Sequence, residues 1–285
     1  MSSRSSQTFR LLLDIAKEAI FAVDGTFMRF AVLRRLRGLS DLEVPSIGRE
    51  VRIPSGSRAL AGWFVLPEGP VLASVLLFHG IGDRILYWRR AQQRLARSGV
   101  ASLVFHYSGY PGSEGASTPE NLDQDARSAY TWLRAKVPAV PVFLLGFSLG
   151  SGLAAEVAGS LEPPPAGLIL AEAFTTLRLA ASRVVGPLNF IARLFPDVWK
   201  TGENVGSLKL PVLVVHSTGD ALFPVAMAEE IFAAAQAGGA PAELILLDGH
   251  RHNAPYWTVP EDYWTAILDF IARTSKTQTG PRERP

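Results

Sequence analysis

The clearest chemical signature in the sequence is the segment Gly-Phe-Ser-Leu-Gly at positions 146–150, which has the G-x-S-x-G spacing of an activated serine. The apolar run at 142–147 predicts a strand that ends just before Ser148, and the small residues at 149–160 predict a helix directly after it. A sharp turn between such a strand and helix lifts a serine hydroxyl above the edge of a sheet. An ordinary glycine-rich turn has the same spacing, so Ser148 is a candidate nucleophile that needs chemical partners.

Those partners are a base and an acid, because a serine hydroxyl at its ordinary pKa is a poor nucleophile. Two of the five histidines, His250 and His252, follow the last expected strand, and either could be the base. The other three stand at expected strand ends, where a structural or pocket-lining role is expected: His79, His106 and His216. Two carboxylates also follow strands, Asp220 in a turn and Glu172 directly after an apolar run.

Metal and cofactor chemistries find little support in the sequence. The pair His250-x-His252 resembles two metal ligands, but no further histidine follows it and the chain has no cysteine. Residues 80–82 read Gly-Ile-Gly without the third glycine and the acidic residue of a dinucleotide fingerprint. There is no phosphate-binding P-loop motif either. We therefore expect neither a metal nor a cofactor.

The elements that must position these residues alternate regularly along the chain. Apolar runs predict eight strands, at 48–53, 60–66, 74–79, 101–106, 142–147, 167–171, 212–216 and 243–247. Helical patterns fall between or after the later strands, at 84–97, 119–136, 149–160, 225–237 and 261–273. This alternation predicts an α/β fold with a mostly parallel eight-stranded sheet, and the first two strands predict a hairpin. Active sites in such sheets lie beyond the carboxyl ends of the strands.

Composition and charge exclude several classes of protein. Of the 285 residues, 48% are hydrophobic and 19% are charged, which excludes a disordered chain. The 28 Lys and Arg residues exceed the 26 Asp and Glu residues by only two, so we expect no nucleic-acid partner. We expect one α/β domain at 47–273 with a small helical cap inserted at 174–209, and a disordered tail at 274–285.

The N-terminal segment, residues 1–46, has a helical and partly basic pattern. Apolar residues recur at helical spacing between Phe9 and Ile20, and three arginines lie between positions 34 and 37. The apolar run is interrupted by charges and is too short to span a bilayer or to act as a secretion signal. We expect either a helix packed on the domain or one that lies on a membrane surface. The expected location is cytoplasmic, with membrane association left open.

Several motifs together make the chain resemble the α/β-hydrolase superfamily. They are residues 78–80, 107–115, 146–150, 211–220 and 249–253. The resemblance runs from about Gly48 to Arg273 and is nearest to the compact group of depalmitoylating enzymes and bacterial esterase-like proteins. It implies an α/β-hydrolase fold with helices on both faces of the sheet. Two departures affect the expected substrate preference: Ile81-Gly82-Asp83 stands where this group usually carries Asn, and Ser108 stands where Arg is commoner.

The resemblance also implies roles for the candidate residues. The superfamily order is serine, acid, histidine, and the chain keeps it with Ser148, Asp220 and His252. His252 is favoured over His250 because Asn253 follows it, as in the family pattern G-x-x-H-N. Glu172 is the alternative acid, since some hydrolases use the position after the sixth strand.

An oxyanion hole completes the implied site. It requires two backbone N–H donors, and the resemblance places them at Leu149 and Ile81. Asp83 is expected to cap a helix that begins at Arg84.

The combined expectation is a serine hydrolase that cleaves carboxylic esters or thioesters of small molecules through an acyl-enzyme. Two alternatives stay open: a peptidase or amidase of the same fold, and a non-catalytic hydrolase fold used for binding. The second would be marked by a broken triad, whereas this chain has all three residue types in order.

Overall fold

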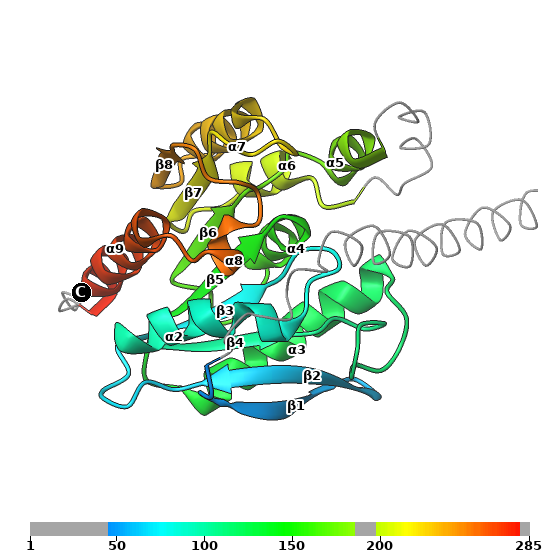
Figure 1. Ribbon diagram of the computed structural model, residues 1–285, viewed down its shortest axis with the longest axis vertical. Coiled ribbons are helices and arrows are strands. Elements are labelled where there is room, and N and C mark those ends of the chain that lie inside the picture. Colours follow the sequence, from blue (N-terminus) through cyan, green and yellow to red (C-terminus); the bar gives the residue numbers. More distant parts are fainter. Residues whose placement is uncertain (1–44, 186–197, 280–285) are drawn as a thin grey trace, which may run out of the picture.

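A single eight-stranded sheet organises the chain in the computed structural model, which describes residues 45–185 and 198–279 (Figure 1). The spatial strand order is β1-β2-β4-β3-β5-β6-β7-β8. The first two strands form an antiparallel hairpin, β2 pairs antiparallel with β4, and every later pairing is parallel. The strands are β1 Arg49–Ser55, β2 Arg58–Val65, β3 Ala73–Phe78, β4 Val100–Phe105, β5 Val142–Phe147, β6 Gly167–Ala171, β7 Val212–Ser217 and β8 Ala242–Leu247.

Helices cover both faces of this sheet (Figure 1). One face packs against α3 Pro119–Lys136, α4 Leu149–Ala158, α6 Thr201–Gly206 and α7 Val225–Ala237. The other face packs against η2 Ile85–Trp88, α2 Arg89–Arg97, α8 Ala254–Trp257 and α9 Glu261–Thr279. A further helix, α5 Leu177–Val185, follows β6.

The central strands are buried on both faces, which explains why their sequences are continuous apolar runs. Successive side chains of a strand point to opposite faces. In β3, Leu76 therefore packs with the helices of the first face, while Val75 and Leu77 pack with those of the second. Large aromatic side chains are buried between the sheet and the helices of the second face, for example Trp88 and Trp264.

All eight expected strands are present, and their ends differ from the expected positions by two residues at most. The expected helix at 84–97 is divided, because its first turn is the 3₁₀ helix η2 and only the remainder is α-helical. The expectation of a disordered tail from residue 274 is wrong for the residues up to 279: α9 continues to Thr279, and Thr274 is buried. Residues 280–285 lie outside the described residues.

Two other expected segments are described only in part. The structure describes residues 174–185 and 198–209 of the expected cap, and α5 and α6 lie in these two stretches. Almost all of the N-terminal segment expected at 1–46 lies outside the described residues. Within the described ranges, none of the helices has both the length and the apolar run needed to cross a membrane.

Candidate active site

Ser148 stands in a strained turn between β5 and α4. Its backbone dihedrals are φ 51° and ψ −120°, a conformation that costs energy in any residue other than glycine. The flanking glycines make the turn possible, since a Cβ on Gly150 would lie 2.1 Å from the carbonyl oxygen of Phe78. A Cβ on Gly146 would lie 2.5 Å from the carbonyl oxygen of Gly150. The G-x-S-x-G spacing therefore has a steric cause at both glycines.

The structure brings Ser148, His252 and Asp220 into one hydrogen-bonded chain. Nε2 of His252 lies 3.0 Å from Oγ of Ser148, and Nδ1 of His252 lies 2.7 Å from Oδ2 of Asp220. A carboxylate accepts only, so the proton on the ring stands at Nδ1 and the Nε2 lone pair faces the serine hydroxyl. This is the tautomer that a histidine needs to act as the base for a serine.

Two aromatic rings flank the His252 imidazole. The ring centroid of Phe147 lies 5.1 Å from it and that of Phe223 lies 5.2 Å from it. These contacts limit rotation of the imidazole, while its side chain remains 16% exposed. The imidazole of His252 is thus held by packing as well as by its two hydrogen bonds.

Asp220 is held by the turn that follows β7. Its Oδ1 accepts hydrogen bonds from the backbone N–H groups of Leu222, at 2.7 Å, and Phe223, at 3.1 Å. Burial acts to raise the pKa of Asp220, but the hydrogen bond and charge of His252 and the two amides outweigh it and hold the pKa below its usual value. Asp220 is therefore ionised at neutral pH.

The alternative base and acid occupy different surroundings. Nε2 of His250 lies 2.8 Å and 3.0 Å from the two carboxylate oxygens of the exposed Asp262. Glu172 is buried after β6, and its Oε2 lies 3.4 Å from Nδ1 of His216. The hydrogen bond to Ser148 is thus made by His252 and not by His250. The hydrogen bond to His252 is made by Asp220 and not by Glu172.

Asp83 stabilises the loop after β3 through hydrogen bonds, and this role differs from the helix cap that the sequence predicts. Oδ2 of Asp83 accepts hydrogen bonds from the N–H of Gly80, at 3.0 Å, and from Nε1 of Trp88, at 3.3 Å. No side-chain cap bond is formed at the start of η2, so the expected helix-capping role of Asp83 is wrong. A buried carboxylate satisfies a loop amide here, and no sequence signal distinguishes that role from a cap.

The two expected oxyanion donors follow neighbouring strands. Leu149 is the first residue of α4, where a helix has no carbonyl of its own to accept the N–H. Ile81 lies in the turn after β3, in which the N–H of Asp83 donates to the carbonyl of Gly80 at 3.3 Å. Because β3 and β5 are paired in the sheet, both loops leave the same edge.

Glu172, His216 and Asp220 also have the spacing of a metal-binding group, since one ligand atom from each lies within 4.8 Å of the others. Two of these residues have competing bonds. Asp220 binds His252, and Nε2 of His216 lies 3.1 Å from the carbonyl oxygen of Phe223. A cation would have to compete with these bonds.

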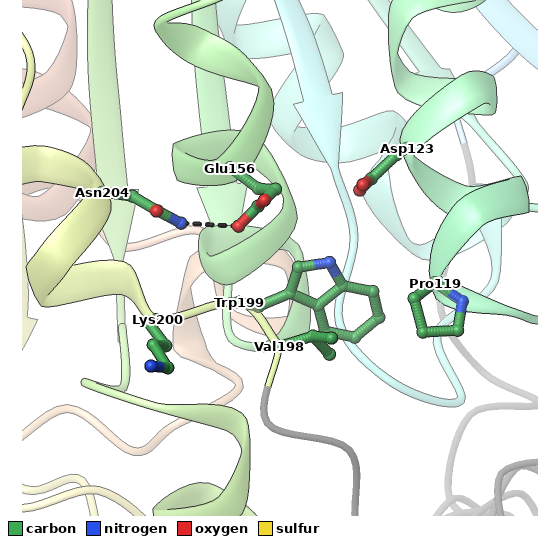
Figure 2. Close-up of a pocket in the computed structure, with 7 residues that line it drawn as sticks. All are labelled: Pro119, Asp123, Glu156, Val198, Trp199, Lys200 and Asn204. Atoms are coloured by element: carbon green, nitrogen blue, oxygen red, sulfur yellow. Dashed lines mark hydrogen bonds between the residues drawn. The ribbon is translucent and has the colours of Figure 1, made fainter. Parts of the chain in front are cut away.

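A pocket lies between α3, α4 and the segment that leads into α6 (Figure 2). It is lined by Pro119, Asp123, Glu156, Val198, Trp199, Lys200 and Asn204. Asn204 donates to Glu156 at 2.7 Å, and burial together with the charge of Glu156 raises the pKa of Asp123 to about 6. Ser148, Asp220 and His252 are not among its lining residues.

The strand order, the strained serine turn and the loops at the carboxyl edge together define the α/β-hydrolase fold. Comparison with known proteins supports the same fold. The family model described as the alpha/beta hydrolase fold matches residues 73–185. An uncharacterized protein of Mycobacterium tuberculosis is 31% identical over 234 residues, which cover 80% of this chain and 80% of that protein. The chain belongs to the α/β-hydrolase superfamily and is a hydrolase.

Two further similarities concern a lipase and an esterase. The lysophosphatidylserine lipase of Danio rerio is 27% identical over 174 residues, which cover 55% of this chain and 44% of that protein. Among solved structures, the esterase Pf2001 of Pyrococcus furiosus aligns with a TM-score of 0.65 at 19% identity, over 79% of this chain and 92% of that chain. At that identity the second similarity shows the fold alone.

Proposed function

We propose that this chain is a serine hydrolase that cleaves carboxylic esters or thioesters through an acyl-enzyme. Ser148 is the nucleophile, His252 the general base and Asp220 the acid that orients the base. The single observation that carries this assignment is the unbroken chain of hydrogen bonds from Asp220 through His252 to the serine hydroxyl. A binding protein of the same fold has no need of this aligned chain.

The proposed mechanism follows from the histidine tautomer. Nε2 of His252 takes the proton from Oγ of Ser148 as that oxygen attacks the acyl carbon, and the resulting imidazolium is stabilised by Asp220. The same proton then passes to the leaving alcohol or thiol, and the acyl group stays on Ser148. Water, deprotonated by His252, releases the acid in the second half of the reaction.

The negative oxygen of the tetrahedral intermediate requires hydrogen-bond donors at the carboxyl edge of the sheet, where Ser148 lies. We assign this role to the backbone N–H groups of Leu149 and Ile81. The first stands at the N-terminus of α4, where the helix dipole favours negative charge. Removing one such donor from an oxyanion hole costs about 10²–10³ in kcat in other serine hydrolases.

The substrate class is proposed from the relatives. The Danio rerio relative is named as a lipase of lysophosphatidylserine, an acyl ester. An ester with an apolar acyl chain therefore ranks above an amide. Each buried methylene of such a chain contributes about 0.8 kcal/mol to binding.

The test of this function is substitution of Ser148. A fluorophosphonate probe is expected to label the wild-type chain, and Ser148→Ala is expected to abolish labelling with an unchanged unfolding midpoint. Hydrolysis of nitrophenyl esters should fall by about 10⁴-fold or more, because triad members act as a unit. Ser151→Ala, at the next serine along the chain and within α4, is the matched control and should still be labelled. Equal labelling of Ser148→Ala would exclude the assignment.

We also propose that the N-terminal segment, residues 1–46, makes peripheral contact with anionic membranes. The support is its sequence pattern of apolar residues at helical spacing followed by three arginines. Deleting residues 1–40 should weaken sedimentation with phosphatidylserine vesicles and leave probe labelling of Ser148 intact. Replacing Arg34, Arg35 and Arg37 by Gln in the full chain is the matched variant and should weaken sedimentation too. Equal sedimentation of all three proteins would contradict the proposal.

A further inference from the structure

A second buried carboxyl group lies beside the triad and takes no part in the proposed mechanism. Glu172 follows β6 with φ 48°, a conformation uncommon outside glycine, and its side chain is fully buried. Oε2 accepts a hydrogen bond from the N–H of Ser217 at 3.2 Å. Oε1 is buried without a hydrogen-bond partner among the described residues. A strained and incompletely satisfied carboxyl group at such a position needs an explanation.

The neighbouring histidine indicates the protonation state of Glu172. Nε2 of His216 lies 3.1 Å from the carbonyl oxygen of Phe223, and a carbonyl only accepts, so Nε2 carries the ring proton. Burial lowers the pKa of His216, so the ring is neutral and Nδ1 is a lone pair. That lone pair lies 3.4 Å from Oε2 of Glu172. If Glu172 were ionised, two acceptors would face each other in a buried space.

The surrounding charges also disfavour an ionised Glu172. The titratable groups that face it are His216 on β7, Asp220 in the turn after β7 and Tyr263 on α9. His252 lies on the other side of Asp220, with its Nδ1 2.7 Å from Oδ2 of that residue. Burial, followed by the negative charge of Asp220, raises the pKa of Glu172 to about 9. Glu172 therefore keeps its proton at neutral pH.

We propose that Glu172 is a positioning residue that works as a neutral carboxylic acid, donating its proton to Nδ1 of His216 and thereby fixing the turn that carries Asp220. The inference rests on the proposed function, because it takes Asp220 as the acid of the triad. One proton between Oε2 and Nδ1 turns a contact between two acceptors into a hydrogen bond.

The peptide groups of Phe223 connect His216 with Asp220. His216 donates to the carbonyl of Phe223, and the N–H of Phe223 donates to Oδ1 of Asp220. The Phe223 ring also packs against His252. Glu172 thus acts on the base and its acid through His216 and the peptide groups of Phe223, without touching the reacting atoms.

The first experiment detects the proton itself by infrared spectroscopy. At pH 7 the wild-type chain should show the C=O stretch of a protonated carboxyl group. This band should be absent in Glu172→Gln and present in Asp262→Asn, the matched control at an exposed carboxylate that also binds a histidine. The band should disappear as the pH rises through about 9. Its absence from the wild type at pH 7 would overturn the proposal.

The second experiment measures the rate of fluorophosphonate labelling at Ser148 between pH 6 and pH 10. At pH 7, Glu172→Gln should label within about tenfold of wild type, the effect of one lost hydrogen bond. Above pH 9 the wild-type rate should fall reversibly, because the ionised carboxylate repels the His216 lone pair and Asp220, while the Gln variant should show no such fall. A wild-type rate that rises there, or a Gln variant as inactive as Asp220→Asn, would overturn the positioning role.

A second variant keeps the inference testable if Glu172→Gln does not fold. His216→Gln should shift the frequency of the carboxyl band without removing it, since the acceptor of the proton changes. An unshifted band would show that the proton is not directed at His216 and would overturn the proposal. These infrared readouts do not depend on catalysis. If Ser148→Ala were still labelled, the proposed function would fail while the shared proton could still be observed.

Discussion

At the scale of single residues, two histidines only two positions apart have different surroundings, and this contrast supports the choice of His252 as the proposed base. His252 points inward between two aromatic rings and bridges Ser148 and Asp220. His250 binds Asp262 near the surface. Both histidines have a carboxylate partner, so a carboxylate partner alone does not identify a base.

The contrast gives a prediction for the two histidines. His252→Ala should reduce kcat for ester hydrolysis by about 10⁴-fold or more, close to the loss in Ser148→Ala, because both remove the same proton transfer. His250→Ala should retain most activity and lose only a surface hydrogen bond to Asp262, worth about 1 kcal/mol. Steady-state kinetics and probe labelling of both variants measure this. The reverse ranking would place the base at position 250.

At this scale the sequence identified the candidate residues but not their hydrogen bonds. The order of Ser148, Asp220 and His252 could be read from motifs, because each follows a strand at the same edge of a parallel sheet. The bond from Asp83 to Gly80 and the contact between Glu172 and His216 could not. They depend on side-chain directions and protonation states, which spacing along the chain does not encode.

At the scale of elements, the approach of α4 to β3 and β5 is set by glycine. The Phe78 carbonyl at the end of β3 leaves no room for a side chain at position 150. Gly152, one turn into the helix, packs closely on Phe174 and Trp199. The helix can begin directly at the serine only because these positions lack a Cβ.

This packing predicts a large effect of one methyl group. Gly150→Ala should abolish probe labelling and destabilise the fold by about 3 kcal/mol or more, since its Cβ would overlap backbone atoms that cannot move independently. Gly202→Ala in α6 is the matched control, because apart from its chain neighbours and the backbone of its own helix no described atom lies within 4 Å of its added Cβ. It should be neutral or stabilising by up to about 1 kcal/mol. Chemical denaturation of both variants tests the difference; equal midpoints would contradict it.

Strands were more predictable than helix ends, for a physical reason. Strands buried on both faces must be apolar along their whole length, so their limits coincide with changes in composition. The end of α9 carries no such signal, because its last turns present mainly polar side chains while Thr274 is buried. The 3₁₀ turn of η2 was missed because the helical pattern continues through it into α2.

At the scale of the whole molecule, buried ionisable groups control how stability depends on pH. The pKa of Glu172 is raised by burial to about 9, well above its value in an unfolded chain. A folded state that holds a proton more tightly than the unfolded state loses stability as the pH rises toward the folded pKa. The buried His79 and His216 act in the opposite direction, because burial lowers their pKa values and acid favours the unfolded chain below about pH 6.5.

The expected result is a thermal midpoint that falls by several degrees between pH 6.5 and pH 9. Scanning calorimetry in low-ionisation-heat buffers measures it, and Glu172→Gln should flatten the fall. A wild-type midpoint that rises over this range would contradict the assignment of a protonated Glu172.

The strand order has one more consequence. β3 lies between β4 and β5 in the sheet. The chain therefore adds β4 on one side of β3 and then adds β5 on the other side. The connection after β3 leads to α2 on one face, and the connection after β5 leads to α4 on the opposite face. Two connections that diverge in this way mark a topological switch point, where ligands bind in open α/β sheets. Ile81 and Ser148 follow the two strands that pair at this point, so the winding of the backbone alone sets the place of the proposed site.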